Sequence, residues 1–270
     1  MAYRMVAIDL DGTLLTDDKR ISERNLAEIR RVLESGAFVI ISTGRAWPGA
    51  EPYVRLLEMS LPVITSNGSM IVDSATGEIL FRRDLTQEAA ETILAKGRKR
   101  LASQVIWSGT TLYGLPLDEH LADYGRRFGK KTPLPMPPME TLREDGISKI
   151  LWYDTPEHIN AWETEVRGEI CEGGALSDVT VVKSQPEFLE FFHAGVSKAK
   201  ALASVTARFG IAMEETVAIG DADNDIPMLK AAGYAVAMGN GSTGAKSAAA
   251  WITDDNEHDG VAKALSRLFP

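Results

Sequence analysis

The chain has 270 residues, a length typical of one large domain or two modest ones. Hydrophobic residues make up 44% and charged residues 25% of it, which argues against a disordered chain. With 29 basic and 38 acidic residues the formal net charge is −9, which argues against sequence-independent binding to nucleic acids or to anionic membranes.

The first and last thirds of the chain alternate short apolar runs with amphipathic stretches. Residues 6–8, 38–41 and 61–64 are predicted strands, and a helix between the first two has Ser22 as its N-cap and Gly36 as its stop. The last third repeats this order, as a helix over 197–209, a strand over 216–219, a helix ending at Ala232, a strand over 234–238 and a helix over 258–268. Continuous apolar strands separated by helices predict a doubly wound, Rossmann-like parallel sheet.

The middle of the chain has a different pattern. Two helices are predicted over 87–100 and 156–167, among strands over 104–107, 147–153 and 179–182, and the proline-rich segment 133–138 is expected to be an extended loop. We therefore expect an α/β core, residues 1–83 and 186–270, interrupted by an inserted α+β domain, residues 84–185. The joints near Arg83-Asp84 and Gln185-Pro186 are the expected hinges.

Two aspartates end the first predicted strand, although aspartate is depleted in strands. The sequence there is Asp9-Leu10-Asp11-Gly12-Thr13. The carboxyl ends of parallel strands face the ligand crevice of an open sheet, and residues two apart share one side of an extended segment. A polar turn after a strand would explain one aspartate, but it does not explain the pair.

A second acidic cluster, Asp221-Ala222-Asp223-Asn224-Asp225, follows Gly220 and another predicted strand. An EF-hand calcium loop fails, because Ile226 stands where that loop needs glycine and Ala232 where it needs glutamate. A helix N-terminus rich in aspartate is the alternative. Two carboxylate clusters at strand ends of one sheet indicate a shared Mg²⁺ ion.

Two further segments could hold a phosphate group. The second strand ends in Ser42-Thr43-Gly44-Arg45, where a hydroxyl and backbone amides precede a helix. Lys198 lies in the first turn of a predicted helix, where a cation opposes the helix dipole and a bound phosphate would explain it. A solvated surface lysine is the alternative.

Residues 239–244 match the dinucleotide-binding pattern GxGxxG after a strand. The next apolar stretch begins within a few residues, which leaves no room for the helix that such a site requires, so we do not predict dinucleotide binding. Asn67-Gly68, between two apolar runs, predicts a hairpin turn.

Together these motifs resemble those of the haloacid dehalogenase superfamily of Mg²⁺-dependent phosphatases. The four motifs of the superfamily occur in order, as Asp9-Leu10-Asp11-Gly12-Thr13, Thr43-Gly44-Arg45, Lys198 and Gly220-Asp221 through Asp225. Further features resemble the Cof-type subfamily with its large α/β cap, namely Asn67-Gly68, Gly195-Val196-Ser197-Lys198, Met238-Gly239-Asn240 and Asp259-Gly260-Val261. Two departures, Ala199 and Gly241, stand where the subfamily usually has glycine and alanine, and neither removes a catalytic group.

The resemblance implies a phosphatase that works through an aspartyl-phosphate. Asp9 would be the nucleophile and Asp11 the general acid and base, and Mg²⁺ would be held by Asp9, Asp221 and the Asp11 carbonyl, with Asp225 in or near its coordination shell. The phosphate would be bound by Thr43, Gly44, Arg45, Asn67, Lys198 and Asn224.

The expected substrates are small phosphate esters, above all sugar phosphates. A phosphosugar mutase of the phosphomannomutase type and a non-catalytic phosphometabolite sensor are the alternatives. We expect no nucleic-acid partner and no membrane anchor, because no run approaches the roughly 18 apolar residues of a membrane span. Asp9 comes too early for a signal peptide, and Cys171 is the only cysteine, so we expect a cytoplasmic protein without disulfides. The oligomeric state cannot be derived from the sequence.

Overall fold

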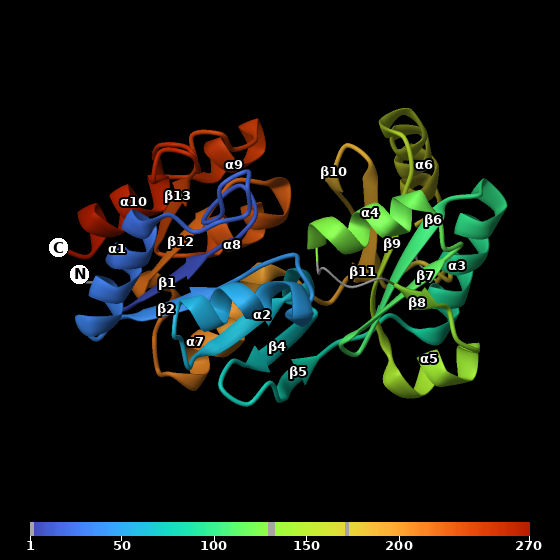
Figure 1. Cartoon of the computed structure of the whole chain (residues 1–270), viewed down its shortest axis with the longest axis horizontal. Helices are drawn as coiled ribbons and strands as arrows, with labels where there is room; N and C mark the ends of the chain where they lie inside the picture. The colour runs from blue at the N-terminus through green and yellow to red at the C-terminus, as the bar shows by residue number, and fades with distance from the viewer. Residues whose placement is uncertain (1–2, 129–132, 171–172) are drawn as a thin grey trace. The chain divides into compact units, whose positions relative to one another are not determined.

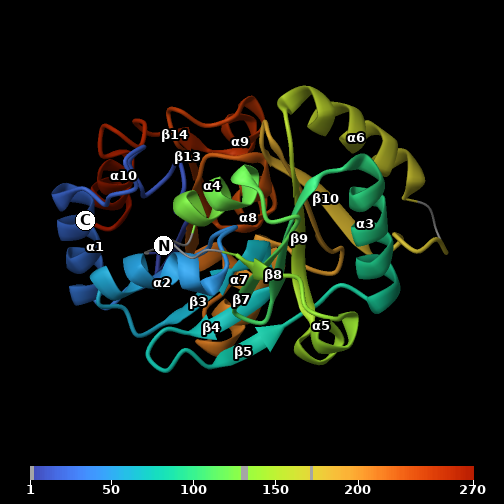
Figure 2. The same cartoon turned by 45° about the vertical axis from the view of Figure 1, so that its right-hand side comes forward.

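The structure is a computed structural model that describes residues 3–128, 133–170 and 173–270, so Cys171 lies outside the described residues. The chain divides into two compact units. Unit 1 comprises Met1–Gly44, Ala50–Phe81 and Ser197–Pro270, and unit 2 comprises Arg45–Gly49 and Arg82–Val196 (Figures 1 and 2).

Unit 1 is built on a five-stranded sheet with the order β14-β13-β12-β1-β2. Every neighbouring pair in this sheet is parallel. The strands are β1 (Met5–Ile8), β2 (Phe38–Ile41), β12 (Thr216–Gly220), β13 (Tyr234–Ala237) and β14 (Trp251–Ile252). All residues of β1 and β12 are buried, which explains why they are continuous apolar runs in the sequence.

Helices cover this sheet as the doubly wound prediction requires. Alternate strand residues such as Ala7 pack with α7 (Lys198–Arg208) and α8 (Ile226–Ala231) in one core cluster. On the other side α1 (Glu23–Glu34) packs against α10 (Gly260–Leu268), beside which it lies in Figure 1. The Ser22 hydroxyl accepts a hydrogen bond from the Asn25 amide, which confirms the predicted N-cap.

A three-stranded sheet, β3 (Pro62–Thr65), β4 (Met70–Asp73) and β5 (Ile79–Arg82), also begins in unit 1. The predicted hairpin at Asn67-Gly68 is confirmed, since β3 and β4 are antiparallel. Its turn is longer than the two residues that the dipeptide indicates, because Ser66–Gly68 form the short 3-10 helix η1. The helix α2 (Trp47–Leu56) precedes this sheet.

One expectation about residues 239–244 is wrong. A six-residue helix, α9 (Thr243–Ala248), does fit between β13 and β14, and β14 pairs parallel to β13. The Ser242 hydroxyl caps this helix by accepting a hydrogen bond from the Ala245 amide.

Unit 2 is built on a six-stranded sheet with the order β10-β11-β9-β6-β7-β8. Its neighbouring strands are antiparallel except β7 and β8, which are parallel. The strands are β6 (Ser103–Ser108), β7 (Thr111–Leu115), β8 (Leu134–Pro135), β9 (Ile147–Tyr153), β10 (Val179–Gln185) and β11 (Phe188–His193). The predicted extended conformation of the proline-rich segment is confirmed, since β8 lies within it.

Helices cover both faces of the unit 2 sheet. One face packs with α3 (Gln87–Arg100) and α6 (Pro156–Glu169), the helices predicted in this region. The other face packs with α4 (Glu119–Phe128) and with Ala46, and Figure 2 shows α4 across the sheet from α3. A short helix, α5 (Met139–Asp145), precedes β9. The mixed α+β character of the insertion is as predicted.

The second expected domain joint requires correction. Gln185 pairs with Phe188 in the β10–β11 hairpin, so Gln185-Pro186 lies inside the unit 2 sheet and cannot join two units. The division falls instead between Val196 and Ser197, after β11. The first division, between Phe81 and Arg82, lies beside the expected joint at Arg83-Asp84. Among the described residues, no helix is both long and apolar enough to cross a membrane.

Candidate active site

Three aspartates meet at the carboxyl edge of the unit 1 sheet. Asp9 follows β1 and Asp221 follows β12, and the parallel pairing of these strands brings both residues to the same edge of the sheet. Asp225 ends the short 3-10 helix η3 (Asp223–Asp225). One oxygen from each carboxylate lies within 4.8 Å of the others. The sequence motifs at residues 9–13 and 220–225 thus form one cluster in the structure.

Lys198 holds two of these carboxylates. It occupies the first position of α7, its side chain is fully buried, and its Nζ donates to Asp9 Oδ1 and to Asp225 Oδ1, each at 2.6 Å. Ser197 caps the helix by accepting a hydrogen bond from the Lys200 amide. The alternative of a solvated surface lysine is therefore wrong.

The Asp225 carboxylate also shapes the loop that carries Asp221. Its Oδ2 accepts hydrogen bonds from the backbone amides of Asp221 and Ala222, both at 3.0 Å. Gly220 leaves the space for it, because a Cβ there would lie 2.6 Å from Asp225 Cγ. This buried carboxylate therefore accepts hydrogen bonds from one ammonium and two amides.

Thr13 and Gly12 support Asp221 from the first motif. The Thr13 hydroxyl donates to Asp221 Oδ1 at 2.8 Å. Gly12 has a φ of 77°, and a Cβ there would lie 2.5 Å from Asp221 Oδ2. Thr13 belongs to the first motif but is not among the predicted site residues, because its contact with Asp221 joins segments that are far apart in the sequence.

Crowding of buried negative charge shifts the pKa values in this cluster. Burial, reinforced by Asp225 and Asp221, raises the pKa of Asp9 well above its usual range although Lys198 opposes this shift. Burial and the charge of Asp225 raise the pKa of Asp221 to about 7. Burial alone would lower the pKa of Lys198, but the charges of Asp225 and Asp9 outweigh it and raise that pKa. One ammonium does not compensate three carboxylates.

Four predicted phosphate-binding residues converge beside this cluster. Thr43 follows β2, next to β1, and its amide donates to the Ile64 carbonyl at 2.9 Å. Its carbonyl accepts from the Asn67 amide at 3.1 Å, and the Asn224 side-chain amide donates to Asn67 Oδ1 at 2.9 Å. A Cβ on Gly44 would lie 3.0 Å from Asn67 Oδ1, so only a residue without a side chain fits there comfortably.

The turn that carries Asn67 lies against the start of α7. Asn67 has a φ of 57°, and Gly68 a φ of 94°. A Cβ on Gly68 would lie only 2.4 Å from the Ser197 carbonyl oxygen, so glycine allows η1 to approach the helix that carries Lys198.

The structure does not place two of the predicted site residues in this cluster. The Asp11 carboxylate lies outside the group of three and forms an ion pair of 2.9 Å with Lys19. Buried Arg45 belongs to unit 2, where its Nη1 donates to the Gly49 carbonyl at 3.1 Å. Its role in binding phosphate stays a prediction.

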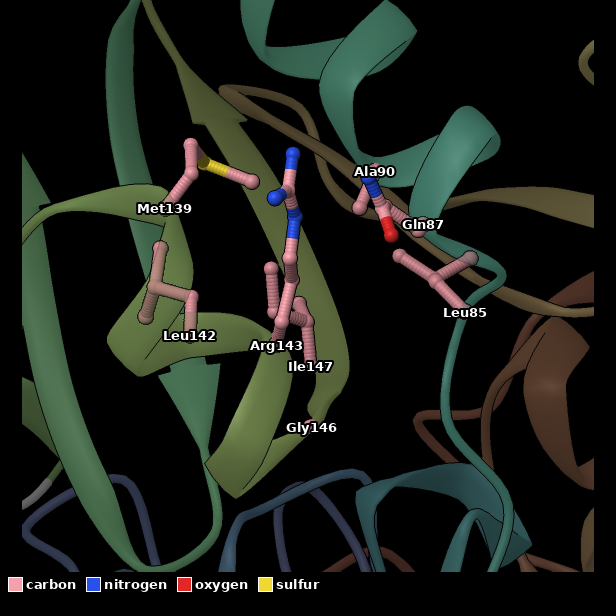
Figure 3. A pocket seen from close by; sticks show the side chains of 8 residues that line it. All are labelled: Leu85, Gln87, Ala90, Met139, Leu142, Arg143, Gly146 and Ile147. Atoms are coloured by element: carbon pink, nitrogen blue, oxygen red, sulfur yellow. The ribbon is translucent and has the colours of Figure 1, made fainter.

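A small cavity in unit 2 does not match a substrate site. It is lined by apolar side chains such as Leu85, Leu142 and Ile147 together with Gln87 and Arg143 (Figure 3). Its volume of about 110 Å³ is smaller than the roughly 300–1,000 Å³ of small-molecule sites. Arg143 is also engaged, since it forms an ion pair of 2.7 Å with Glu91.

Residues 6–265 match the family described as haloacid dehalogenase-like hydrolases. The chain therefore belongs to that family, and to its Cof-type members. It is 31% identical over 273 residues to the 5-amino-6-(5-phospho-D-ribitylamino)uracil phosphatase YcsE of Bacillus subtilis, which covers 97% of this chain and 94% of that protein. It is 29% identical over 245 residues to the HMP-PP phosphatase of Serratia proteamaculans, which covers 88% of this chain and 84% of that protein.

Solved structures agree with this assignment. The crystal structure of a haloacid dehalogenase-like hydrolase from Bacteroides thetaiotaomicron matches with a TM-score of 0.86 and 29% identity, over 99% of this chain and 100% of that one. The α/β fold with an inserted domain and the superfamily predicted from the motifs are confirmed. The protein is a phosphatase.

Proposed function

We propose that the protein is a Mg²⁺-dependent phosphatase that hydrolyses small phosphate monoesters through an aspartyl-phosphate on Asp9. The observation that carries this proposal is the group of Asp9, Asp221 and Asp225 at the carboxyl edge of the sheet, in which Asp9 and Asp225 are buried and share Lys198. A nucleophile, an anion-binding ammonium and a set of cation ligands are thereby available within one cluster.

The three carboxylates fit a magnesium ion by their chemistry. Mg²⁺ prefers oxygen ligands and is usually held by one or two carboxylates, waters and substrate phosphate oxygens. Asp9 and Asp221 are the proposed ligands together with the Asp11 carbonyl, with Asp225 beside them. The bound cation would screen the negative charges of the nucleophile and the phosphate from each other.

In the first proposed step the Asp9 carboxylate attacks the phosphorus atom of the ester. The new bond joins an Asp9 oxygen to phosphorus, and the bond between phosphorus and the leaving oxygen breaks. Asp11, protonated, gives its proton to that oxygen, so that the product leaves as a neutral alcohol. Thr43, the Gly44 amide and Lys198 hold the equatorial oxygens, with Asn224, Asn67 and Arg45 around them.

In the second proposed step a water molecule hydrolyses the aspartyl-phosphate. The Asp11 carboxylate takes a proton from the water as the water oxygen bonds to phosphorus. The bond between phosphorus and the Asp9 oxygen breaks, which restores the Asp9 carboxylate and releases inorganic phosphate. Asp11 is then protonated for the next turnover.

We further propose that unit 1 is the catalytic core and unit 2 the cap that selects the leaving group. The substrates proposed are phosphorylated sugars or sugar alcohols. Two observations support this choice. The B. subtilis relative YcsE is named as a phosphatase of a compound with a phosphoribityl group, and the negative net charge of this chain does not favour nucleic-acid substrates.

Phosphate release from a panel of sugar phosphates, phosphoglycolate and nucleotides, in Mg²⁺ and in EDTA, tests the proposal. We expect release that requires Mg²⁺ and is abolished in Asp9→Asn. Isomerisation that depends on added bisphosphate would identify a mutase instead. Tight binding without phosphate release, in protein shown to be folded, would identify a sensor.

A further inference from the structure

We propose that Lys19 is a positioning residue for the Asp11 carboxylate, a role that rests on the proposed function of Asp11 as proton donor and acceptor. The Nζ of Lys19 lies 2.9 Å from Asp11 Oδ1. Lys198 binds Asp9 and Asp225, and Thr13 binds Asp221, so Lys19 provides Asp11 with a cation of its own.

The turn that carries Lys19 is closed by hydrogen bonds between its two ends. The Thr16 amide donates to the Arg20 carbonyl at 2.9 Å, and the Lys19 amide donates to the Thr16 carbonyl at 2.8 Å. The Arg20 amide in turn donates to the Thr16 hydroxyl at 3.1 Å. The Lys19 backbone is therefore fixed, although its side chain is long.

Lys19 occupies this turn in an unfavourable backbone conformation. Its φ is 58°, in the left-handed region that glycine and asparagine adopt with less strain. A lysine at this position gives no advantage to the turn itself. Its ammonium, placed on Asp11, supplies the reason for the side chain.

Two asparagines tie the same loop to the catalytic motif. The Asn240 side-chain amide donates to the Gly12 carbonyl at 2.8 Å, and its oxygen accepts from the Asn256 amide at 3.2 Å. The Asn256 side-chain amide donates to the Leu15 carbonyl at 3.0 Å and to Asp17 Oδ1 at 3.1 Å. The loop is thus held at Gly12, just after Asp11, and at Asp17, just before the turn.

Because the ion pair is partly exposed, the effect of Lys19 on the position of Asp11 can be tested without unfolding the protein. The side chains of Lys19 and Asp11 are 38% and 26% exposed, and ion pairs exposed to this degree contribute little to stability. A variant without the ammonium is therefore expected to fold. Its Asp11 side chain would sample other rotamers, so fewer molecules would have the carboxyl group aligned for proton transfer.

The experiment compares Lys19→Met, which retains much of the length without the charge, with Lys19→Arg, which retains the charge. Arg20→Met is the matched control, since Arg20 lies in the same turn and pairs with Asp18 instead. The substrates are phenyl phosphate and 4-nitrophenyl phosphate, which differ little in shape. Phenolate needs a proton as it leaves, whereas 4-nitrophenolate leaves readily without one.

We expect Lys19→Met to lower kcat/KM for phenyl phosphate by about twofold to fivefold, which is as much as an exposed ion pair allows, and to leave that for 4-nitrophenyl phosphate unchanged. With 4-nitrophenyl phosphate, acid-quenched Lys19→Met should contain more phosphorylated Asp9 than wild type, because water activation also depends on Asp11. Lys19→Arg should restore much of the loss, and Arg20→Met should match wild type. A crystal structure of Lys19→Met should show the Asp11 carboxylate in a different rotamer.

Equal losses on both substrates would overturn the inference, because they would indicate weaker phosphate binding instead of misplaced proton transfer. Wild-type rates in Lys19→Met, or an unchanged Asp11 rotamer, would also overturn it. These results differ from a failure of the proposed function, in which the wild type itself shows no Mg²⁺-dependent release or Asp9→Asn retains it.

Discussion

Replacing Lys198 by methionine tests how the charges of the site are balanced. The substitution removes the ammonium that binds Asp9 and Asp225 at 2.6 Å each, and it leaves three carboxylates within 4.8 Å of one another. The Lys198 and Asp225 side chains are fully buried and that of Asp9 is 7% exposed, so water cannot replace the lost partner.

The expected loss of stability is large when no divalent cation is present. Removing one partner of a buried ion pair typically costs about 3–5 kcal/mol. At roughly 2–4 °C per kcal/mol for a protein of this size, Tm in EDTA should fall by about 6–20 °C. Saturating Mg²⁺ should return more of this stability to Lys198→Met than it adds to wild type, because the variant offers the cation a more negative site. Phosphatase activity should still fall by about 10²–10³-fold, since the phosphate loses a charged donor.

Thermal unfolding of both proteins in EDTA and in Mg²⁺ measures these effects. Lys149→Met is the matched control, because Lys149 is also buried and forms an ion pair of 3.3 Å, with Glu190 in unit 2. It should lose stability as well, but its gain from Mg²⁺ should equal that of wild type. Equal gains from Mg²⁺ in all three proteins would refute the cation site at these aspartates.

Three further outcomes are expected. Asp11→Asn should lower kcat by about 10²–10⁴-fold. With 4-nitrophenyl phosphate it should accumulate phosphorylated Asp9, which mass spectrometry after acid quenching detects. Normal turnover by this variant would exclude Asp11 as the proton carrier. Thr13→Val, which removes the hydrogen bond to Asp221, should raise the Mg²⁺ concentration for half-maximal activity by about tenfold to a hundredfold, and an unchanged value would count against Asp221 as a ligand. Burial raises the pKa of Asp221 to about 7 in the folded state, so at this residue the folded protein binds more protons than the unfolded one. The contribution of Asp221 to stability in EDTA should therefore be present at low pH and lost as pH rises toward 7. Urea titrations across this range should show a weaker pH dependence in Asp221→Asn than in wild type.

The strands of the unit 1 sheet were predictable because burial on both faces leaves a simple signal. β1, β2, β12 and β13 are continuous apolar runs, and their positions agree with the predicted segments to within one or two residues. β5 was missed although Ile79-Leu80-Phe81 is an apolar run, and this run is mostly exposed in the structure.

The strand β11 was missed for a different reason. It is almost entirely buried, yet Glu190 stands in its middle, and a charged residue breaks the apolar pattern. The structure compensates this charge with Lys149 of β9, a partner 41 residues away. Because no local pattern reveals that pairing, the domain joint was placed before β11.

The candidate site also contains residues that could be predicted from the sequence and residues that could not. Asp9, Lys198, Asp221 and Asp225 could be predicted to meet, because motif order and strand topology bring them to one edge. The contacts of Asn240 and Asn256 could not, since they join residues more than two hundred positions apart in the sequence. The contact of Lys19 with Asp11 is local, but it depends on a turn in which Lys19 has a φ of 58°, and the sequence does not indicate that turn.

The pairing of β1 with β12 has a consequence for how the chain folds during its synthesis on the ribosome. Met5 pairs with Thr216, so the interior strand β1 is synthesised long before β12, one of its two neighbours, exists. Nearly all of unit 2, Arg82–Val196, is one continuous stretch that emerges in between, and domains generally fold as units during synthesis. We expect protease treatment of ribosome-bound chains to find unit 2 protected while residues 5–8 are still cleavable. The reason is that β1 can pair with β12 only after the last quarter of the chain has been synthesised.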